Sequence, residues 1–400
     1  MNMKTSNLKV LLVLILCALL LCAAPQPLVR AENSTITTHA RAAALIDVAS
    51  GRLLYSSRGD EPMLIASLTK IMTALVAIEN GDLRSKVKVG KNAFAKEGSS
   101  LFLKQGEEMR LEDMLYGLML RSGNDAATAI AEHVGGSEEG FVYLMNAKAE
   151  ELGLQHTHFT NPHGLDAEGH YSSANDLAVL TAYAMHNPVF KQIVKTQVKT
   201  ADNPYEPWDY KWLNKNKMLR LYEGADGVKT GYTKKALRCL VSSATRGGQQ
   251  LVAVTLNDGN DWNDHAVLLD YGFNHYPLKT LVERGEGISG YSFVPARTFA
   301  YPLGQGEEAR LVTKLELIRE NKNTRRSSFG IKGALVLQLG GKEIGRVPVY
   351  MPDRLPPEQS PYEKRFQHAG AAAYPADNWL QALGSALRAL FQIGAAGNKQ

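Results

Sequence analysis

The chain has 400 residues, of which 44% are apolar and 21% are charged, proportions that are ordinary for a folded soluble protein and argue against a disordered or membrane-spanning chain. The formal net charge is +5, but Lys4, Lys9 and Arg30 lie in the first 31 residues, so the remainder has 42 basic and 40 acidic residues and gives no indication of nucleic-acid binding. Because a single core stops growing near roughly 250–300 residues, the length favours two domains plus tails.

Residues 1–31 have the features of a secretory signal peptide. Two lysines precede an uninterrupted apolar run over residues 10–24, and small residues stand at a cleavage site over residues 29–31. The apolar run is shorter than a membrane-spanning helix requires. Export would leave Cys239 as the only cysteine, which excludes an intramolecular disulfide, and its apolar neighbours predict a buried, inert thiol.

The exported part is predicted to begin with a strand, a turn and a second strand over residues 42–55. Residues 68–80 are apolar on nearly every face, which predicts a helix buried in the core. Three more helical patterns follow, at 111–120, 126–134 and 141–152. Three β-branched runs then predict strands, at 228–230, 239–241 and 251–255. This order favours an α/β sandwich whose sheet is built from both ends of the domain.

Beyond residue 276 the helical patterns give way to short strand-like runs, which predict a small β-sandwich domain over residues 277–351. Residues 352–376 contain several prolines and are predicted to form a stiff linker. Residues 377–400 place apolar side chains at helical spacing opposite a polar face, which predicts an amphipathic helix. We favour membrane anchoring over docking of this helix on its own domain, so we expect an exported protein held peripherally on the outer face of the cytoplasmic membrane.

Ser67 and Lys70 lie where the predicted buried helix begins. Residues three apart share one helix face, so the Lys70 amine can approach the Ser67 hydroxyl near the positive end of the helix. Serine needs a base to act as a nucleophile, and lysine is one only if burial lowers its pKa far below the ordinary value near 10.4. The Ser-x-x-Lys pattern alone is weak evidence, because it recurs at Ser6 and Ser85.

A second motif, with Ser122 and Asn124, follows the predicted helix 111–120. A tight polar turn here can place a hydroxyl and an amide beside the first motif, where the hydroxyl could relay a proton to a leaving amine. A turn that caps the next helix fits the same residues, and a similar Ser-Ala-Asn sequence occurs at 173–175. The motif therefore has meaning only in combination with the others.

A third motif, Lys229-Thr230-Gly231, occurs once and lies on a predicted strand. Gly231 would let a peptide substrate approach the backbone, and the two preceding side chains could hold a carboxylate. An edge strand with an exposed lysine is the alternative interpretation.

In this order the three motifs resemble those of the penicillin-recognising serine enzymes. The segments 66–73, 122–126, 161–176 and 226–233 are similar to low-molecular-mass penicillin-binding proteins, the serine-type D-alanyl-D-alanine carboxypeptidases of the peptidase S11 type. The resemblance implies a penicillin-binding or β-lactamase-like catalytic domain over residues 32–276, with an antiparallel sheet flanked by helices and a helical subdomain. The small all-β domain and the amphipathic C-terminal helix also resemble the C-terminal parts of that family.

The resemblance implies an enzyme that removes the terminal D-alanine from peptidoglycan stem pentapeptides. Ser67 would form the acyl-enzyme, Lys70 would accept its proton, and Ser122 and Asn124 would assist. β-Lactams would act as covalent inhibitors, and no cofactor would be needed.

The resemblance also implies that Lys229 and Thr230, followed by Gly231, bind the terminal carboxylate. The backbone amides of Ser67 and Tyr232 would form an oxyanion hole. Lys215 stands where some relatives have arginine, and a lysine cannot hold a carboxylate through two parallel hydrogen bonds. A second departure is Leu237, at a position where many relatives have glycine.

Two other functions remain as alternatives. A β-lactamase would need fast deacylation, but no Glu-x-x-x-Asn sequence lies between the second and third motifs, since Glu168 is followed four residues later by Ser172. A catalytically inactive wall-binding protein would use the β domain and the tail instead. The histidines, including His156 and His158, are scattered and predict no metal site. The glycine-rich sequence at 285–290 precedes a strand-like segment, which argues against dinucleotide binding.

Overall fold

The structure is a computed structural model, and it describes residues 36–318 and 330–357. The predicted signal peptide, the amphipathic helix over 377–400 and most of the proline-rich linker lie outside the described residues. Within the two described ranges, no helix has both the length and the apolar character needed to cross a bilayer.

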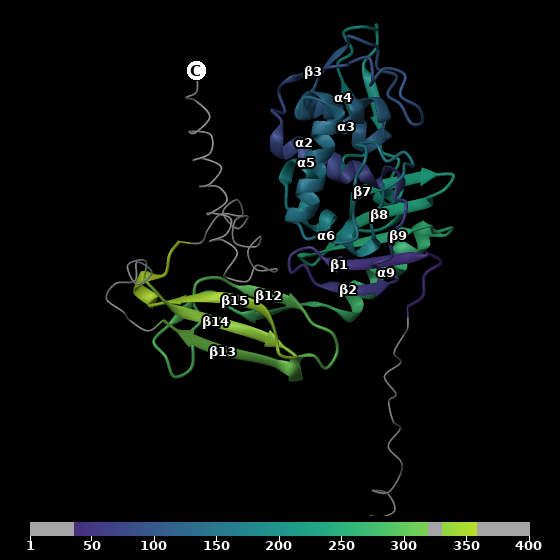
Figure 1. The fold of residues 1–400 in the computed structure, drawn as a ribbon. Coiled ribbons are helices and arrows are strands. Elements are labelled where there is room, and N and C mark those ends of the chain that lie inside the picture. The colour runs from purple at the N-terminus through teal and green to yellow at the C-terminus, as the bar shows by residue number, and fades with distance from the viewer. Residues whose placement is uncertain (1–35, 319–329, 358–400) are drawn as a thin grey trace, which may run out of the picture. The chain divides into compact units, whose positions relative to one another are not determined.

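A five-stranded antiparallel sheet forms the centre of the N-terminal two thirds of the described chain (Figure 1). Its strands follow the order β2-β1-β9-β8-β7, so a strand from the start of the region pairs with one from its end. The five strands are β1 (Ala42–Asp47), β2 (Leu53–Ser57), β7 (Ala225–Thr233), β8 (Leu237–Arg246) and β9 (Gln249–Leu256). The prediction of a sheet built from both ends is confirmed.

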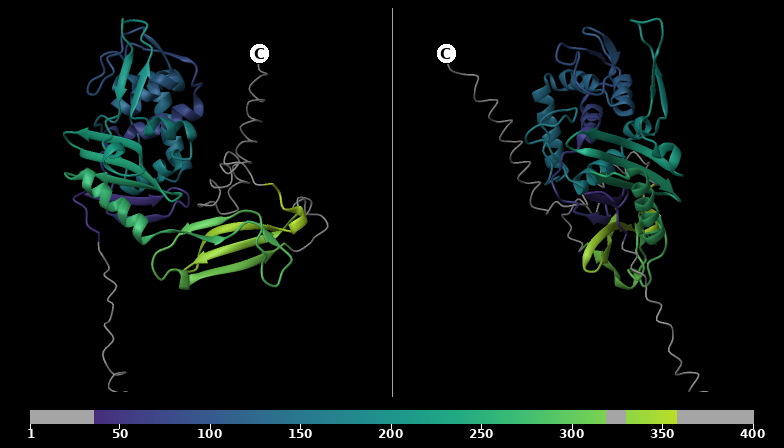
Figure 2. Two further views of the ribbon diagram at one scale, coloured as in Figure 1. Left: turned by 180° about the vertical axis from the view of Figure 1, so that it is seen from behind. Right: turned by 90° about the vertical axis from the view of Figure 1, so that its right-hand side faces the viewer.

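Helices cover both faces of this sheet (Figures 1 and 2). α6 (Ala174–Ala184) packs on β1 and β9 from one side, and α9 (Asp261–His275) packs on β8 and β9 from the other. Successive side chains of β9 point to opposite faces of the sheet. Val252 belongs to the core shared with the helical region, and Leu251 contacts α9 on the other face. Every residue of β9 is buried, as expected for a strand covered on both faces.

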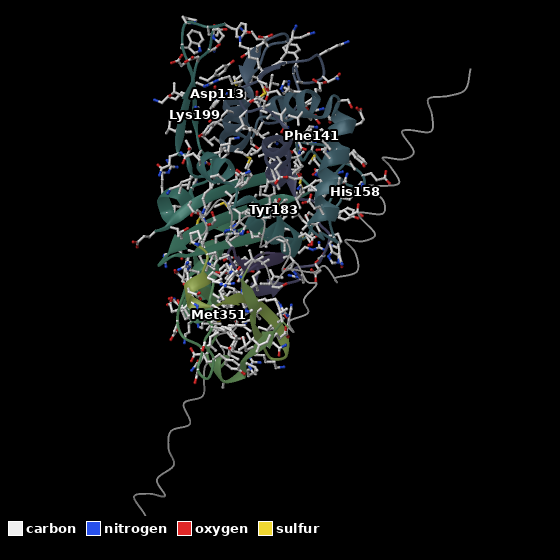
Figure 3. The ribbon with its side chains drawn as sticks, turned by 90° about the vertical axis from the view of Figure 1, so that its left-hand side faces the viewer. Asp113, Phe141, His158, Tyr183, Lys199 and Met351 are labelled. Carbon is white, nitrogen blue, oxygen red and sulfur yellow. The ribbon has the colours of Figure 1, made fainter. Side chains whose placement is uncertain are left out.

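The helical region surrounds one fully buried helix, α2 (Lys70–Asn80), in which every residue from Lys70 to Ala77 is buried. Three predicted helices pack around it within a few residues of their expected ends, as α3 (Leu111–Arg121), α4 (Asn124–Gly135) and α5 (Glu138–Glu151). Phe141 of α5 is fully buried in this core (Figure 3). The prediction of a buried helix from the apolar residues 71–77 is therefore confirmed.

Several short elements complete the region and were not predicted. They are α7 (Pro188–Lys195), α8 (Met218–Leu221), the ribbon of β3 (Lys86–Lys88) with β4 (Glu108–Arg110), and the hairpin of β5 (Val198–Ala201) with β6 (Tyr210–Leu213). α6 and α9 were missed as well. α9 mixes apolar residues with buried polar ones such as Asp264 and His265, which obscures its helical periodicity.

Beyond α9 the described chain consists of strands and short turns. β13 (Leu311–Leu317), β14 (Ile331–Leu339), β15 (Lys342–Tyr350) and β11 (Val294–Pro295) form an antiparallel sheet, and β10 (Leu278–Val282) pairs with β12 (Phe299–Pro302). A small apolar cluster of their own, including Leu337, Val347 and Val349, is buried between these strands.

Two residues singled out in the sequence have clear structural settings. Cys239 on β8 is buried, as predicted, and burial raises the pKa of its thiol to about 12. Leu237 has a left-handed backbone conformation, with φ of +60°. A leucine pays a steric penalty in this conformation that glycine does not, which explains why glycine suits the position.

Candidate active site

Ser67 lies in a single 3₁₀ turn, η1 (Ala66–Thr69), directly before α2. The sequence predicted that a helix begins here; the helix itself begins three residues later, at Lys70. Side chains three apart eclipse in a 3₁₀ turn, so the difference brings the two motif residues closer together. Ser67 is half-buried while both of its neighbours are buried, so its hydroxyl lies at the edge of the core.

Lys70 has no solvent exposure, and its Nζ has three oxygen neighbours. It lies 3.2 Å from Ser67 Oγ, 2.7 Å from Asn124 Oδ1 and 2.5 Å from the carbonyl oxygen of His163. Burial, reinforced by the charges of Lys229 and Lys215, holds the pKa of Lys70 well below its usual value.

A neutral Lys70 fits these three contacts well. A neutral amine has two N–H donors and one lone pair, and the oxygens of Asn124 and His163 can accept both hydrogens. The lone pair is then left to accept the proton of the Ser67 hydroxyl. The His163 contact uses a backbone carbonyl, which side-chain motifs do not reveal.

The second motif lies in the turn between α3 and α4. Asn124 is the first residue of α4, and its Nδ2 donates to the carbonyl of Glu97 at 2.6 Å, so the orientation of its amide is fixed while Oδ1 faces Lys70. Ser122 is buried and has a left-handed backbone, with φ of +70°. Within residues 36–318, no hydrogen bond joins the Ser122 hydroxyl to Ser67 or to either buried lysine of the site.

The third motif lies on β7, which runs past the turn that contains Ser67. Lys229 is 1% exposed, so the interpretation as an exposed edge lysine is wrong. Burial and the charge of Lys215 lower the pKa of Lys229 to about 7, and its Nζ donates to the carbonyl of Thr230 at 2.9 Å. A Cβ on Gly231 would lie 3.2 Å from the Ser67 nitrogen, so glycine permits a close approach of the two backbones.

Lys215 and Tyr232 lie at the border of the site. The Lys215 backbone nitrogen donates to Leu120 at the end of α3, and its Nζ lies 3.3 Å from Ser99 Oγ. Its charge contributes to lowering the pKa of both Lys70 and Lys229, which places it near both. Tyr232 on β7 has an exposed side chain. Lys215 and Tyr232 therefore border the region that contains Ser67, Lys70 and Lys229.

A loop over residues 161–166 packs against η1, the turn that contains Ser67. Gly164 has φ of +83°, and a Cβ there would lie only 1.9 Å from the carbonyl oxygen of Ala66. Asn161 Oδ1 accepts a hydrogen bond from the Gly164 nitrogen at 2.7 Å, and Asp166 accepts one from Thr233 at the end of β7. The loop thus connects the turn with β7.

Together these residues can perform acyl transfer. A serine hydroxyl lies beside an amine whose pKa is lowered, and a second buried lysine can attract an anionic group of a ligand. Among the residues that the structure describes, no group of His, Cys, Asp and Glu is arranged to hold a metal ion.

Comparisons with known proteins agree with this chemistry. The model of the family described as Peptidase S11, D-alanyl-D-alanine carboxypeptidase, matches residues 29–260. The chain is 35% identical over 338 residues to D-alanyl-D-alanine carboxypeptidase DacF of Bacillus subtilis (strain 168), a match that covers 80% of this chain and 86% of the relative. It is 34% identical over 345 residues to DacC of Escherichia coli (strain K12), covering 78% and 82%. The structure matches penicillin binding protein 5 from Haemophilus influenzae with a TM-score of 0.64 and 28% identity, over 78% of this chain and 96% of that one.

The support that the loop gives to the turn that contains Ser67 can be tested with two alanine variants. Gly164→Ala and Gly169→Ala both place alanine at a left-handed φ, but the nearest atom to a Cβ at Gly169 is 3.6 Å away. We expect Gly169→Ala to cost about 1 kcal/mol of unfolding free energy from backbone strain alone. Gly164→Ala should cost at least about 2 kcal/mol more, because its Cβ must displace the Ala66 carbonyl. Equal losses in denaturant unfolding would contradict this role of the loop.

Proposed function

The chain belongs to the peptidase S11 family of D-alanyl-D-alanine carboxypeptidases and is a serine-type hydrolase of this kind; we propose that Ser67 is its nucleophile and Lys70 its general base. The observation that carries the assignment is the contact of 3.2 Å between the Ser67 hydroxyl and a fully buried amine. The substrate is a peptidoglycan stem peptide that ends in D-Ala-D-Ala, and β-lactams compete for the same serine.

Acylation begins when Ser67 Oγ attacks the carbonyl carbon of the penultimate D-alanine and its proton passes to Lys70 Nζ. The negative charge that develops on the carbonyl oxygen is stabilised by the backbone N–H groups of Ser67 and Tyr232, a role that the approach of β7 to the nucleophile turn supports. The C–N bond then breaks, and the leaving D-alanine takes the proton, with Ser122 assisting the transfer. Water hydrolyses the resulting ester with Lys70 again as the base.

Lys229 and Thr230 bind the C-terminal carboxylate of the substrate in this proposal, and Lys215 adds positive potential. A buried lysine whose pKa is lowered to about 7 gains its charge fully when an anion arrives beside it. Lys70 and Lys229 thus have different tasks: Lys70 acts as a base in its neutral form, and Lys229 binds the carboxylate in its charged form.

The alternatives receive less support. A β-lactamase needs an efficient deacylating base, and the chain lacks a Glu-x-x-x-Asn sequence between the second and third motifs. A catalytically inactive protein has no need for a buried amine in contact with an accessible serine, because burying an amine destabilises the fold.

The chain beyond the catalytic region bears on the domain organisation and the cellular location of the enzyme. We propose that residues 277–351 form a separate small β domain, supported by the buried cluster between their strands. Residues 1–31 would direct export, and the helix over 377–400 would hold the enzyme at the outer face of the cytoplasmic membrane. Both segments lie outside the described residues, and the sequence alone supports these roles.

The nucleophile can be identified by mass spectrometry after treatment with benzylpenicillin. We expect one acyl group per molecule on the peptide that contains Ser67, and none in Ser67→Ala. Ser85→Ala is a matched control, because Ser85 lies in the same Ser-x-x-Lys pattern but outside the site, and it should retain full labelling. Acylation of a different serine, or rapid nitrocefin turnover without release of D-alanine, would overturn the proposal.

The different tasks of Lys70 and Lys229 predict a bell-shaped pH profile for the second-order rate constant of acylation by benzylpenicillin. The rate should rise as Lys70, whose pKa lies well below its usual value, loses its proton, and it should fall as Lys229, whose pKa is lowered to about 7, loses its charge and with it the attraction for the carboxylate. Lys229→Met should react at least about tenfold more slowly and should lack the alkaline limb. A limb near pH 7 that persisted in Lys229→Met would assign it to another group.

A further inference from the structure

A groove with a volume of about 450 Å³ borders the active site, between the loop over residues 100–107 and the β5–β6 hairpin. This volume lies within the roughly 300–1,000 Å³ of small-molecule sites in proteins. Its lining includes an unusual set of aromatic side chains, namely Phe102, Tyr205, Trp208, Tyr210 and Trp212. Neither the catalytic steps nor the binding of the terminal carboxylate uses this groove.

Phe102 lies in a loop with a strained backbone, and its side chain is exposed to solvent. Its backbone φ is +63°, a conformation that bulky residues rarely adopt, and its side chain is 85% exposed. The Asp125 carboxylate fixes both neighbours of Phe102, because it accepts hydrogen bonds from the Leu101 nitrogen at 2.9 Å and from the Leu103 nitrogen at 3.2 Å. The hydrogen bonds to Asp125 therefore stabilise the strained backbone of Phe102, and in this conformation the Phe102 ring is exposed to solvent.

The opposite wall of the groove is fixed as well. Lys199 on β5 forms an ion pair of 3.0 Å with Asp113 on α3, which ties the hairpin to the helical core (Figure 3). The Tyr205 hydroxyl accepts a hydrogen bond from the Glu108 nitrogen, which joins the hairpin to β4. Trp208, in the turn of this hairpin, is nevertheless 65% exposed. Exposed rings on two anchored walls indicate a preformed binding surface.

The charges that line the groove are balanced. Three basic and three acidic side chains take part, namely Lys104, Arg121, Lys211, Glu107, Glu206 and Asp209. Such a lining does not select a polyanion or a polycation. It suits a neutral ligand with many hydrogen-bonding groups and apolar ring faces, because aromatic side chains offer flat apolar surfaces and the charged ones offer polar contacts. A chain of pyranose sugars has this chemistry.

The groove and the second motif share the chain segment between α3 and α4. Arg121 lines the groove and directly precedes Ser122, while Asp125 directly follows Asn124. The Asn124 nitrogen also donates to the carbonyl of Ser99, one residue before the loop. A stem pentapeptide reaches at most about 17 Å when extended, so the sugar attachment point of a substrate whose end lies at Ser67 stays within about that distance of the α3–α4 segment that lines the groove.

We propose that this groove binds the glycan strand to which the stem peptide is attached, with Phe102 and Trp208 stacking on sugar rings. The inference rests on the proposed function, since it assumes that the peptide end is bound at Ser67. It makes the enzyme selective for stem peptides carried on glycan over free peptides of the same sequence.

The experiment compares two substrates: a free pentapeptide that ends in D-Ala-D-Ala, and the same pentapeptide on a tetrasaccharide of N-acetylated amino sugars. For the wild type we expect a higher kcat/KM with the glycan-linked substrate. Trp208→Ala and Phe102→Ala should each lower the ratio of the two kcat/KM values about fivefold or more, and Trp208→Tyr should restore most of it. Tyr143→Ala removes an equally exposed ring of α5 outside the groove and should leave the ratio unchanged.

The outcomes separate this inference from the proposed function. If the wild type hydrolyses both substrates but the ratio is the same in the wild type and in both alanine variants, the glycan-binding role is wrong and the carboxypeptidase proposal stands. If Trp208→Ala slows both substrates equally, with benzylpenicillin acylation at the wild-type rate as evidence of an intact site, the groove binds the peptide instead. If the wild type hydrolyses neither substrate, the proposed function itself fails.

Discussion

The site depends on an amine that is buried at the start of α2 without a carboxylate partner. Lys70 Nζ contacts only neutral oxygens among the hydrogen bonds of the described residues, and two other lysines add positive potential. The nearby Asp125 carboxylate is directed to backbone amides of the loop over 100–107 instead. This environment disfavours the charged form of the amine and lowers its pKa, and the neutral form is the one that can accept a proton.

The fold brings this environment together from segments that are distant in sequence. The 3₁₀ turn places Ser67 over Lys70, the start of α4 supplies Asn124, and β7 passes close to the turn because residue 231 has no side chain. Gly164 permits a similarly close approach of the loop over residues 161–166 to the same turn. The same α3–α4 segment also anchors the loop that presents Phe102, so catalysis and the proposed glycan contact have a common scaffold.

The sequence was informative where chemistry depends on side chains and uninformative where it depends on backbone. Ser67, Lys70 and Lys229 were predicted as site residues because their types and order are distinctive, and the buried helix was correctly predicted from its apolar composition. The His163 contact was not predictable, since any residue supplies a carbonyl. Equally, no periodicity indicates that Phe102 has a left-handed backbone, because the conformation is imposed by long-range hydrogen bonds to Asp125.

The central claim is that Lys70 is neutral in the resting enzyme, and its protonation state can be measured directly. Carbon NMR of protein labelled with ¹³C at the lysine ε position follows each amine through a pH titration, and Lys70→Met identifies the resonance of interest. We predict that Lys70 titrates far below the ordinary lysine value of 10.5. Titration of that resonance at the ordinary value would show that Lys70 is charged at neutral pH, and it could not then be the base that activates Ser67.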